Sequence, residues 1–100
     1  MKFGLSDKEY QLLDQIVFTP LKAAGATIFI FGSRARGSHH RYSDIDILTQ
    51  SDSDLSRLIS QLIDNIEASN FPYKVDIVEE RHLADSYKAS VRRDKISVPS

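Results

Sequence analysis

The sequence predicts an α/β (α+β) fold with a mixed sheet of three strands flanked by about four helices. Three runs rich in β-branched and aromatic residues, at 26–31, 44–49 and 73–78, are typical of buried strands. Apolar residues at three- and four-residue steps before, between and after these runs indicate helices. The connection between the first two runs has about a dozen residues, which is short for a helical crossover between parallel strands. We therefore expect a mixed sheet rather than an all-parallel one.

The first expected helix opens with a capping box, in which Glu9 follows Ser6 by three residues. Pro20 is expected to kink or break this helix near Thr19, because proline cannot donate the backbone hydrogen bond that a helix interior requires. Gly25 is then expected to end it, since glycine readily adopts the left-handed conformation found at helix ends. The apolar stripe of this helix consists of Leu12, Leu13, Ile16, Val17 and Leu21.

Residues 33–38 follow the first strand and are expected to form a turn and a short helical segment that ends at Gly37. Ser51 or Ser53 is expected to cap the next helix. The apolar stripe of that helix consists of Leu55, Leu58, Ile59, Leu62, Ile63 and Ile66. A last, weaker helix is indicated by apolar residues that recur at every fourth position, Leu83, Tyr87 and Val91. We expect residues 93–100 to form a loose tail.

The bulk composition is that of an ordinary globular protein, with 41% hydrophobic and 27% charged residues. With 100 residues, the chain is expected to form a single domain spanning 1–100. A net charge of −1 argues against stable nucleic-acid binding, which needs a basic surface. The chain has no cysteine, and His39 and His40 lack a spaced partner, so we expect no zinc site. The first ten residues include the polar run 6–9, which argues against a signal peptide there, and no apolar segment is long enough to span a membrane, so we expect a cytoplasmic protein that does not bind a membrane.

Three aspartates form a candidate metal site. Because side chains alternate along a strand, Asp44 and Asp46 share one face of the second expected strand. Adjacent carboxylates on a half-buried strand repel each other and lose hydration, and divalent cations such as Mg²⁺ would remove that penalty. Asp76, from the third strand, would complete a pocket for two ions, which in two-metal sites lie roughly 3.5–4 Å apart. A solvated strand edge is the alternative for all three, and for Asp76 taken alone the two interpretations are evenly balanced.

The turn after the first strand is a candidate phosphate site. Gly32 and Ser33 offer backbone amides and a hydroxyl there, and a glycine allows close approach of a ligand to the backbone. Arg34, Arg36 and Arg41 follow without an intervening acid and could pair with a triphosphate. The alternative for these arginines is a solvated loop, and we expect no more than one or two of them to bind phosphate.

Together these residues resemble the nucleotidyltransferase superfamily of the DNA polymerase beta type, and more narrowly the minimal nucleotidyltransferases. The latter are short, single-domain bacterial and archaeal proteins, and the resemblance covers roughly residues 5 to 93. The residues that carry it are Gly32, Ser33, Asp44, Asp46 and Asp76, within the segments 31–37 and 43–48 and the third strand. The resemblance implies the nucleotidyltransferase fold, with the mixed sheet expected above.

The resemblance also implies a reaction: a nucleoside monophosphate, AMP from ATP, passes from a Mg²⁺-bound nucleotide to an acceptor hydroxyl, and pyrophosphate is released. In this reading Gly32 and Ser33 hold the β- and γ-phosphates. Asp44 and Asp46 coordinate both ions. Asp76 ligates the catalytic ion near the acceptor and helps to deprotonate the acceptor hydroxyl.

The minimal subgroup is similar to the antitoxin half of two-gene systems whose other member is a helical HEPN protein. In such systems the nucleotidyltransferase can transfer AMP to a tyrosine of the toxin. Residues 93–100 contain no obvious acceptor-binding element, so we expect the acceptor to come from a partner or from a homo-oligomer surface. Two alternatives remain open: a non-catalytic antitoxin that masks a HEPN toxin, and a nucleotidyltransferase acting on a small molecule such as an antibiotic.

Overall fold

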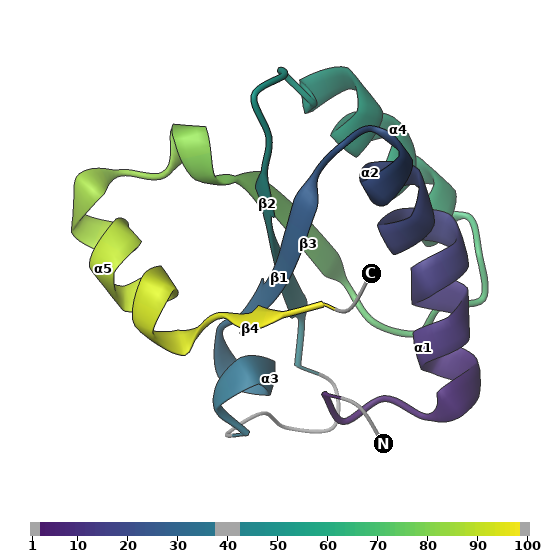
Figure 1. Cartoon of the computed structure of the whole chain (residues 1–100). Helices are drawn as coiled ribbons and strands as arrows, with labels where there is room; N and C mark the ends of the chain where they lie inside the picture. Colours follow the sequence, from purple (N-terminus) through teal and green to yellow (C-terminus); the bar gives the residue numbers. More distant parts are fainter. Residues whose placement is uncertain (1–2, 38–42, 99–100) are drawn as a thin grey trace.

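The computed structural model of the protein describes residues 3–37 and 43–98 (Figure 1). In chain order its elements are α1 (Asp7–Leu13), a π-helical segment (Asp14–Phe18), α2 (Thr19–Ala23), β1 (Thr27–Phe31), α3 (Ser33–Arg36), β2 (Ile45–Gln50), α4 (Ser56–Glu67), β3 (Val75–Glu79), a 3-10 turn (Glu80–His82), α5 (Asp85–Asp94) and β4 (Ile96–Ser97). Within the described ranges, no helix has the length and apolar character needed to cross a membrane.

The strands form one sheet in the order β3-β2-β1-β4. β2 pairs antiparallel with β1 and parallel with β3, and β1 pairs antiparallel with β4. The expected mixed sheet is therefore confirmed. The short link through α3 returns the chain antiparallel, whereas the longer one through α4 has room for a parallel crossover. Figure 1 shows α1, α2 and α4 on one side of the sheet and α5 on the other.

The first helical stretch begins as the sequence predicts. The backbone N–H of Glu9 donates to Ser6 Oγ at 3.1 Å, and the Ser6 N–H donates to Glu9 Oε1 at 2.8 Å. Pro20 is the second residue of α2, which continues directly from the π-helical segment, so the helical stretch changes its hydrogen bonding before Pro20 but does not break there. The regular helix changes to the π-helical segment just before it, and Gly25, with φ +86°, follows the end of α2.

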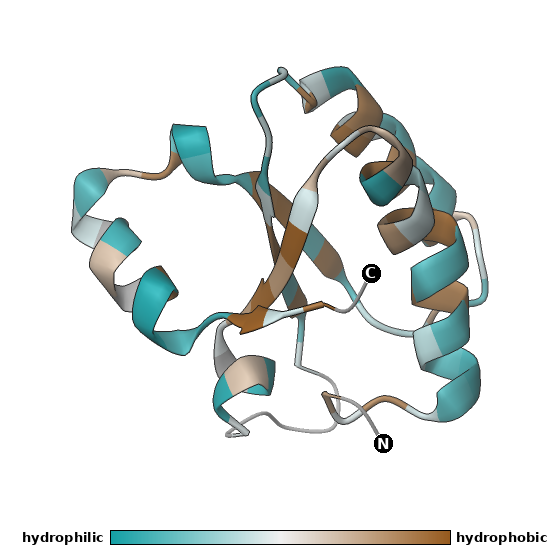
Figure 2. Ribbon diagram, in the orientation of Figure 1, coloured by the Kyte–Doolittle hydropathy of each residue, from teal (hydrophilic) through white to brown (hydrophobic). Residues whose placement is uncertain are grey.

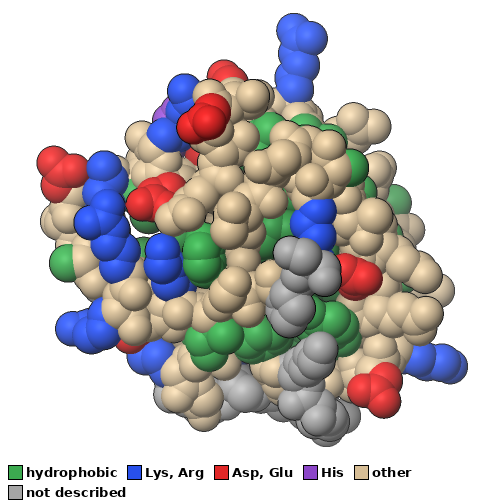
Figure 3. Space-filling view, viewed as in Figure 1, with side chains coloured by type: hydrophobic (Ala, Val, Ile, Leu, Met, Phe, Trp, Pro, Cys, Tyr) green, Lys and Arg blue, Asp and Glu red, His purple; other side chains and the backbone are tan. Residues whose placement is uncertain are grey.

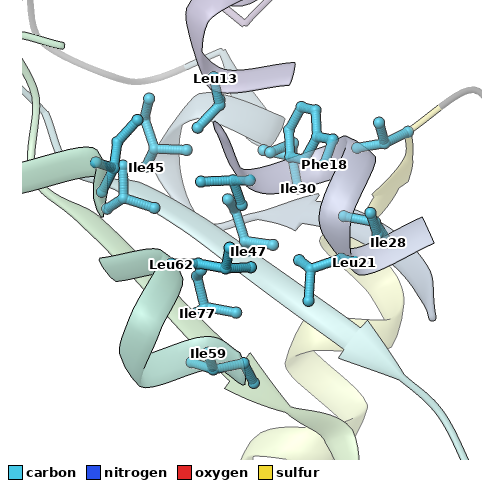
Figure 4. Packing of buried hydrophobic residues seen from close by; sticks show 14 of the residues in the cluster. Leu13, Phe18, Leu21, Ile28, Ile30, Ile45, Ile47, Ile59, Leu62 and Ile77 are labelled. Atoms are coloured by element: carbon cyan, nitrogen blue, oxygen red, sulfur yellow. The ribbon is translucent and has the colours of Figure 1, made fainter. Parts of the chain in front are cut away.

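The main core lies between the sheet and the three helices on one side (Figure 4). Ile45 and Ile47 of β2 are fully buried there, as their alternation along the strand predicts. Figure 2 shows the apolar residues concentrated on the strands and on the helix sides that face them. Leu48 is also buried, on the face beneath α5, beside Leu83 and Val91. Both faces of β2 are therefore covered near its middle.

The expected loose tail at 93–100 is corrected by the structure. Part of it forms β4, which adds a fourth strand to the sheet. The backbone N–H of Val98 donates to the carbonyl of Ile28 at 2.9 Å, and the Val98 side chain is buried. Because β1 would otherwise present unpaired backbone groups at an open edge, even two residues of strand are favoured there.

The expected cap of α4 is also corrected. The helix begins at Ser56, so Ser51 and Ser53 lie too early to cap it. The backbone N–H of Leu55 instead donates to Oε1 of Glu79 at 2.9 Å, and Glu79 belongs to β3. Leu55 is the N-cap residue, and the first N–H of the helix, from Ser56, donates to Oδ1 of Asp54 at 2.9 Å.

Val98→Ala is expected to lower the free energy of unfolding by about 1–2 kcal/mol, because two buried methyl groups are lost. Ile96→Ala is the matched control, since Ile96 is 41% exposed and should cost much less. Urea denaturation of both variants measures the difference. Equal losses for the two variants would mean that the end of the chain does not pack as described.

Candidate active site

Three strands bring the predicted carboxylates to one end of the sheet. Asp46 in β2 lies directly opposite Asp76 in the parallel strand β3. On its other side, Asp46 lies opposite Phe31, the last residue of β1, which Gly32 follows directly. Side chains directly opposite each other in a sheet lie on the same face. Asp44 is exposed and comes immediately before β2, two residues before Asp46, so the alternation of the strand puts both on the same side.

Gly32 is in close contact with Asp46. Its φ is +76°, a value that side chains rarely tolerate, and a Cβ added to it would lie only 2.4 Å from Asp46 Oδ2. The Asp46 carboxylate thus rests against the backbone at the end of β1. The backbone of Ser33 begins α3 immediately after this contact. From the sequence, Gly32 is expected near the carboxylates only because of the family resemblance. The structure shows that Gly32 and Asp46 are in direct contact.

Asp46 is in an unfavourable environment for a charge. The pKa of its half-buried carboxyl is raised, first by burial and then by the carboxylates of Asp76 and Asp44. Arg36 and Lys74 offset part of this effect. Crowded oxygen donors of like charge are the donor set that Mg²⁺ takes, so these residues fit a divalent cation.

The structure also contains another acidic group, at the opposite end of β3. Among the described residues, one group of three acidic or histidine side chains has its ligand atoms within 4.8 Å of one another. This group consists of Asp54, Glu79 and His82, and it is not the triad that the sequence predicts. Glu79 already accepts from the Leu55 backbone and from Ser56 Oγ, and its Oε2 lies 3.2 Å from His82 Nε2. This cluster therefore has a structural role at the start of α4. Asp76, near the start of β3, does not belong to this cluster, and its Oδ1 lies 3.9 Å from Lys74 Nζ.

The two described arginines of the loop occupy different environments. Arg34 is 3% exposed, and its guanidinium donates to the backbone carbonyls of Ser43 and Phe3. Arg36 is half exposed, and its Nη1 lies 3.2 Å from Oδ2 of Asp94 in α5. Of the two, only Arg36 presents its charge toward the carboxylates, where it lowers the pKa of Asp46. His39, His40 and Arg41 lie outside the described residues.

Sequence reasoning missed the partners of these arginines. Asp94 sits at the end of α5, in the region expected to begin a loose tail, and no local pattern marks it as a partner of Arg36. Tyr73, whose ring centroid lies 4.6 Å from Arg34 Cζ, was assigned only to a strand. The exposed Lys and Arg side chains over α5 in Figure 3 show that this helix brings further positive charge to the same side of the sheet. The basic residues in and just after α5 are Lys88, Arg92, Arg93 and Lys95.

Residues 11–98 match the family described as "Nucleotidyltransferase domain", and the chain belongs to this family. Among curated proteins it is similar to MntA of Haemophilus influenzae, assigned there as a protein adenylyltransferase. The two are 28% identical over an alignment 68 residues long, which covers 67% of this chain and 60% of MntA. The match thus spans less than two thirds of that relative.

Solved structures show the same likeness. A protein assigned as a minimal nucleotidyltransferase superposes with a TM-score of 0.68 at 26% identity, over all of this chain and 97% of that one. A toxin–antitoxin structure with AMP-PNP superposes with a TM-score of 0.67 at 25% identity, over 84% of this chain and 70% of that one. A nucleotidyltransferase assigned in Sulfolobus solfataricus shares the fold, with a TM-score of 0.51 at 23% identity.

Gly32→Ala is expected to destabilise the protein more than Gly37→Ala. Both glycines have φ +76°, so alanine carries the same backbone penalty of about 1–2 kcal/mol at either site. Only at position 32 would the new methyl group also collide with Asp46, because nothing lies within 4 Å of a Cβ at Gly37. Urea denaturation measures the difference, and equal losses would contradict the contact.

Asp46→Asn is expected to raise the midpoint of thermal unfolding at neutral pH, without divalent cations, by a few degrees. The folded-state pKa of Asp46 lies above its ordinary value of 3.8, so the wild type loses stability as the pH rises through the folded pKa. The gain from asparagine should therefore disappear below pH 3.8, where the carboxyl is protonated in both states. Asp52→Asn, in an exposed loop, is the control; a gain that persists in acid would contradict this prediction.

Proposed function

We propose that this protein is a Mg²⁺-dependent nucleotidyltransferase that moves a nucleoside monophosphate, AMP from ATP, to a hydroxyl of a partner protein. The observation that carries the proposal is the register of Asp46 with Asp76, with Gly32 packed against the Asp46 carboxylate. Membership of the nucleotidyltransferase family supports the reaction class. The similarity to a protein assigned as a protein adenylyltransferase supports AMP as the transferred group and a protein as the acceptor.

The proposed roles of the residues follow from their positions. Asp44, Asp46 and Asp76 would hold two Mg²⁺ ions, which supply positive charge to the reacting phosphoryl group and lower the pKa of the acceptor hydroxyl. Gly32 lets the Asp46 carboxylate lie against the backbone, and the backbone of Gly32 and Ser33 would hold the β- and γ-phosphates. Arg36 would contribute positive charge to the triphosphate from its half-exposed position, once released from Asp94.

In the transfer step, the acceptor oxygen forms a bond to the α-phosphorus of ATP. The bond from that phosphorus to the oxygen that bridges to the β-phosphate breaks, and pyrophosphate leaves. Asp76 lies at the β3 side of the site and receives the proton of the acceptor hydroxyl in this proposal. The positive charge of Arg36 beside Asp46 helps to neutralise the departing pyrophosphate.

The acceptor is proposed to belong to a helical HEPN-type toxin, which makes this chain an antitoxin. The end of the described chain is used to extend the sheet as β4, so it provides no separate acceptor-binding element in residues 94–98. The structural neighbour that is a toxin–antitoxin with AMP-PNP supports this assignment. A second copy of the chain is the other source of an acceptor surface. We propose a single domain that acts in the cytoplasm, where ATP, Mg²⁺ and such a partner occur together.

Incubation with α-labelled ATP, Mg²⁺ and the protein product of the neighbouring gene is expected to label that product. Asp44→Asn and Asp46→Asn should each lower the labelling rate by more than about 100-fold, because even residues that only support metal ligands change metal affinity or activity by 10–100-fold. Asp52→Asn, another exposed aspartate in a loop, is the matched control and should label normally. Persistent labelling by the Asp44→Asn, Asp46→Asn double variant would contradict the proposal.

The same variants separate the two alternatives. If the chain only masks the toxin, the double variant should still protect cells that express the toxin, although it labels nothing. If the chain instead modifies a small molecule such as an antibiotic, the isolated wild type should label that molecule without any protein partner.

A further inference from the structure

Arg34 is buried although its side chain is always charged. Of the described residues, it and Glu79 are the two charged residues in the buried class. Burying a guanidinium is costly unless its N–H groups are hydrogen-bonded. Here Nε and Nη2 both donate to the carbonyl of Ser43, at 3.1 and 2.9 Å, and Nη1 donates to the carbonyl of Phe3 at 2.8 Å. The guanidinium therefore faces inward, to backbone oxygens, and only 3% of the residue remains exposed.

The partners of Arg34 come from segments far apart in the sequence. Phe3 precedes α1, and Ser43 precedes β2. The Tyr73 ring, just before β3, lies against the guanidinium with 4.6 Å between its centroid and Cζ, a favourable cation–π distance. One buried side chain thus joins three parts of the fold.

Asp44 depends on this arrangement for its position. It lies just outside β2. The pairing of β2 with β3 begins at Ile45, and its pairing with β1 begins at Asp46. On one side of Asp44, the N–H of Ile45 donates to the Lys74 carbonyl at 2.9 Å. On the other side, the peptide that joins it to Ser43 is held through its carbonyl by the two bonds from Arg34. The backbone of Asp44 is therefore fixed from both ends.

We propose that Arg34 is a positioning residue that holds Asp44 in place for metal binding, and not a ligand of the triphosphate. This inference rests on the proposed function, because it assigns Asp44 to a metal site. A planar guanidinium can donate two bonds to one carbonyl while a third reaches Phe3, and the point-like ammonium of lysine cannot reproduce that fork. Arg34 and Arg36 consequently have different roles although they lie two residues apart.

The test compares the full-length wild type with Arg34→Lys and Arg34→Met, with Arg57→Met as the matched control on the exposed surface of α4. Three quantities are measured: Mn²⁺ affinity without nucleotide, ATP affinity without divalent cations, and hydrogen exchange of the Ile45 amide. We expect Arg34→Lys to lower Mn²⁺ affinity about tenfold, as loss of a supporting partner does, and to speed exchange at Ile45. ATP affinity without metal should not change. Arg57→Met should alter none of the three.

A phosphate ligand would give the opposite pattern. Arg34→Met would then weaken metal-free ATP binding while Arg34→Lys retained it, and Mn²⁺ affinity would stay unchanged in both; that result overturns the proposal. Unchanged exchange at Ile45 in Arg34→Lys overturns it as well. If the wild type itself bound no Mn²⁺, the proposed function would fail, whereas the exchange at Ile45 would still decide whether Arg34 holds this segment. Arg34→Lys keeps the positive charge, so it provides the readout if Arg34→Met does not fold.

Discussion

The register of β2 with its two neighbours is the constraint on which the site depends. β2 is antiparallel to β1 and parallel to β3, so a residue near its start meets the end of one strand and the start of the other. Asp46 occupies that position. A shift of one residue in either pairing would turn Asp46 toward the apolar core and expose Ile45 or Ile47, both fully buried. The hydrophobic face of β2 therefore keeps its carboxylates on the opposite face.

The two ends of β3 use carboxylates in contrasting ways. Glu79, at the end of β3, is buried but accepts hydrogen bonds from several donors. One of them is the backbone N–H of Leu55, just before α4. Near the start of β3, Asp76 lies opposite Asp46 of β2, and the pKa of Asp46 is raised first by burial and then by the neighbouring carboxylates. Carboxylates with donors stabilise a fold, whereas crowded ones reduce stability unless a cation joins them. This contrast separates the structural cluster from the candidate active site.

α5 and β4 complete the side of the sheet that carries the carboxylates. Val91 of α5 packs on the sheet, and Asp94 at its end forms an ion pair with Arg36. A pair with a half-exposed partner contributes little to stability, of the order of 0–1 kcal/mol. Its consequence is local: it ties Arg36, whose charge acts on Asp46, to the end of α5. The end of α5, which leads into β4, thus contacts a residue of the candidate site as well as continuing into the sheet.

The sequence by itself determined the local structure and the identity of the candidate residues. β-branched runs indicated three strands, Ser6 and Glu9 marked the start of α1, and Gly32, Asp44, Asp46 and Asp76 carried the resemblance to the nucleotidyltransferases. The strands and the helix start depend on residues close together in the chain, whose geometry follows from the alternation of a strand or the first turn of a helix.

Only the tertiary structure decided which partners those residues have. It turned Arg34 inward and Arg36 outward, placed the Glu79 carboxylate where it accepts the Leu55 N–H before α4, and paired residues of the expected tail with the open edge of β1. Each of these outcomes depends on burial or on an unsatisfied backbone group contributed by a distant segment. Such partners meet only when the sheet has formed, so no local pattern contains them.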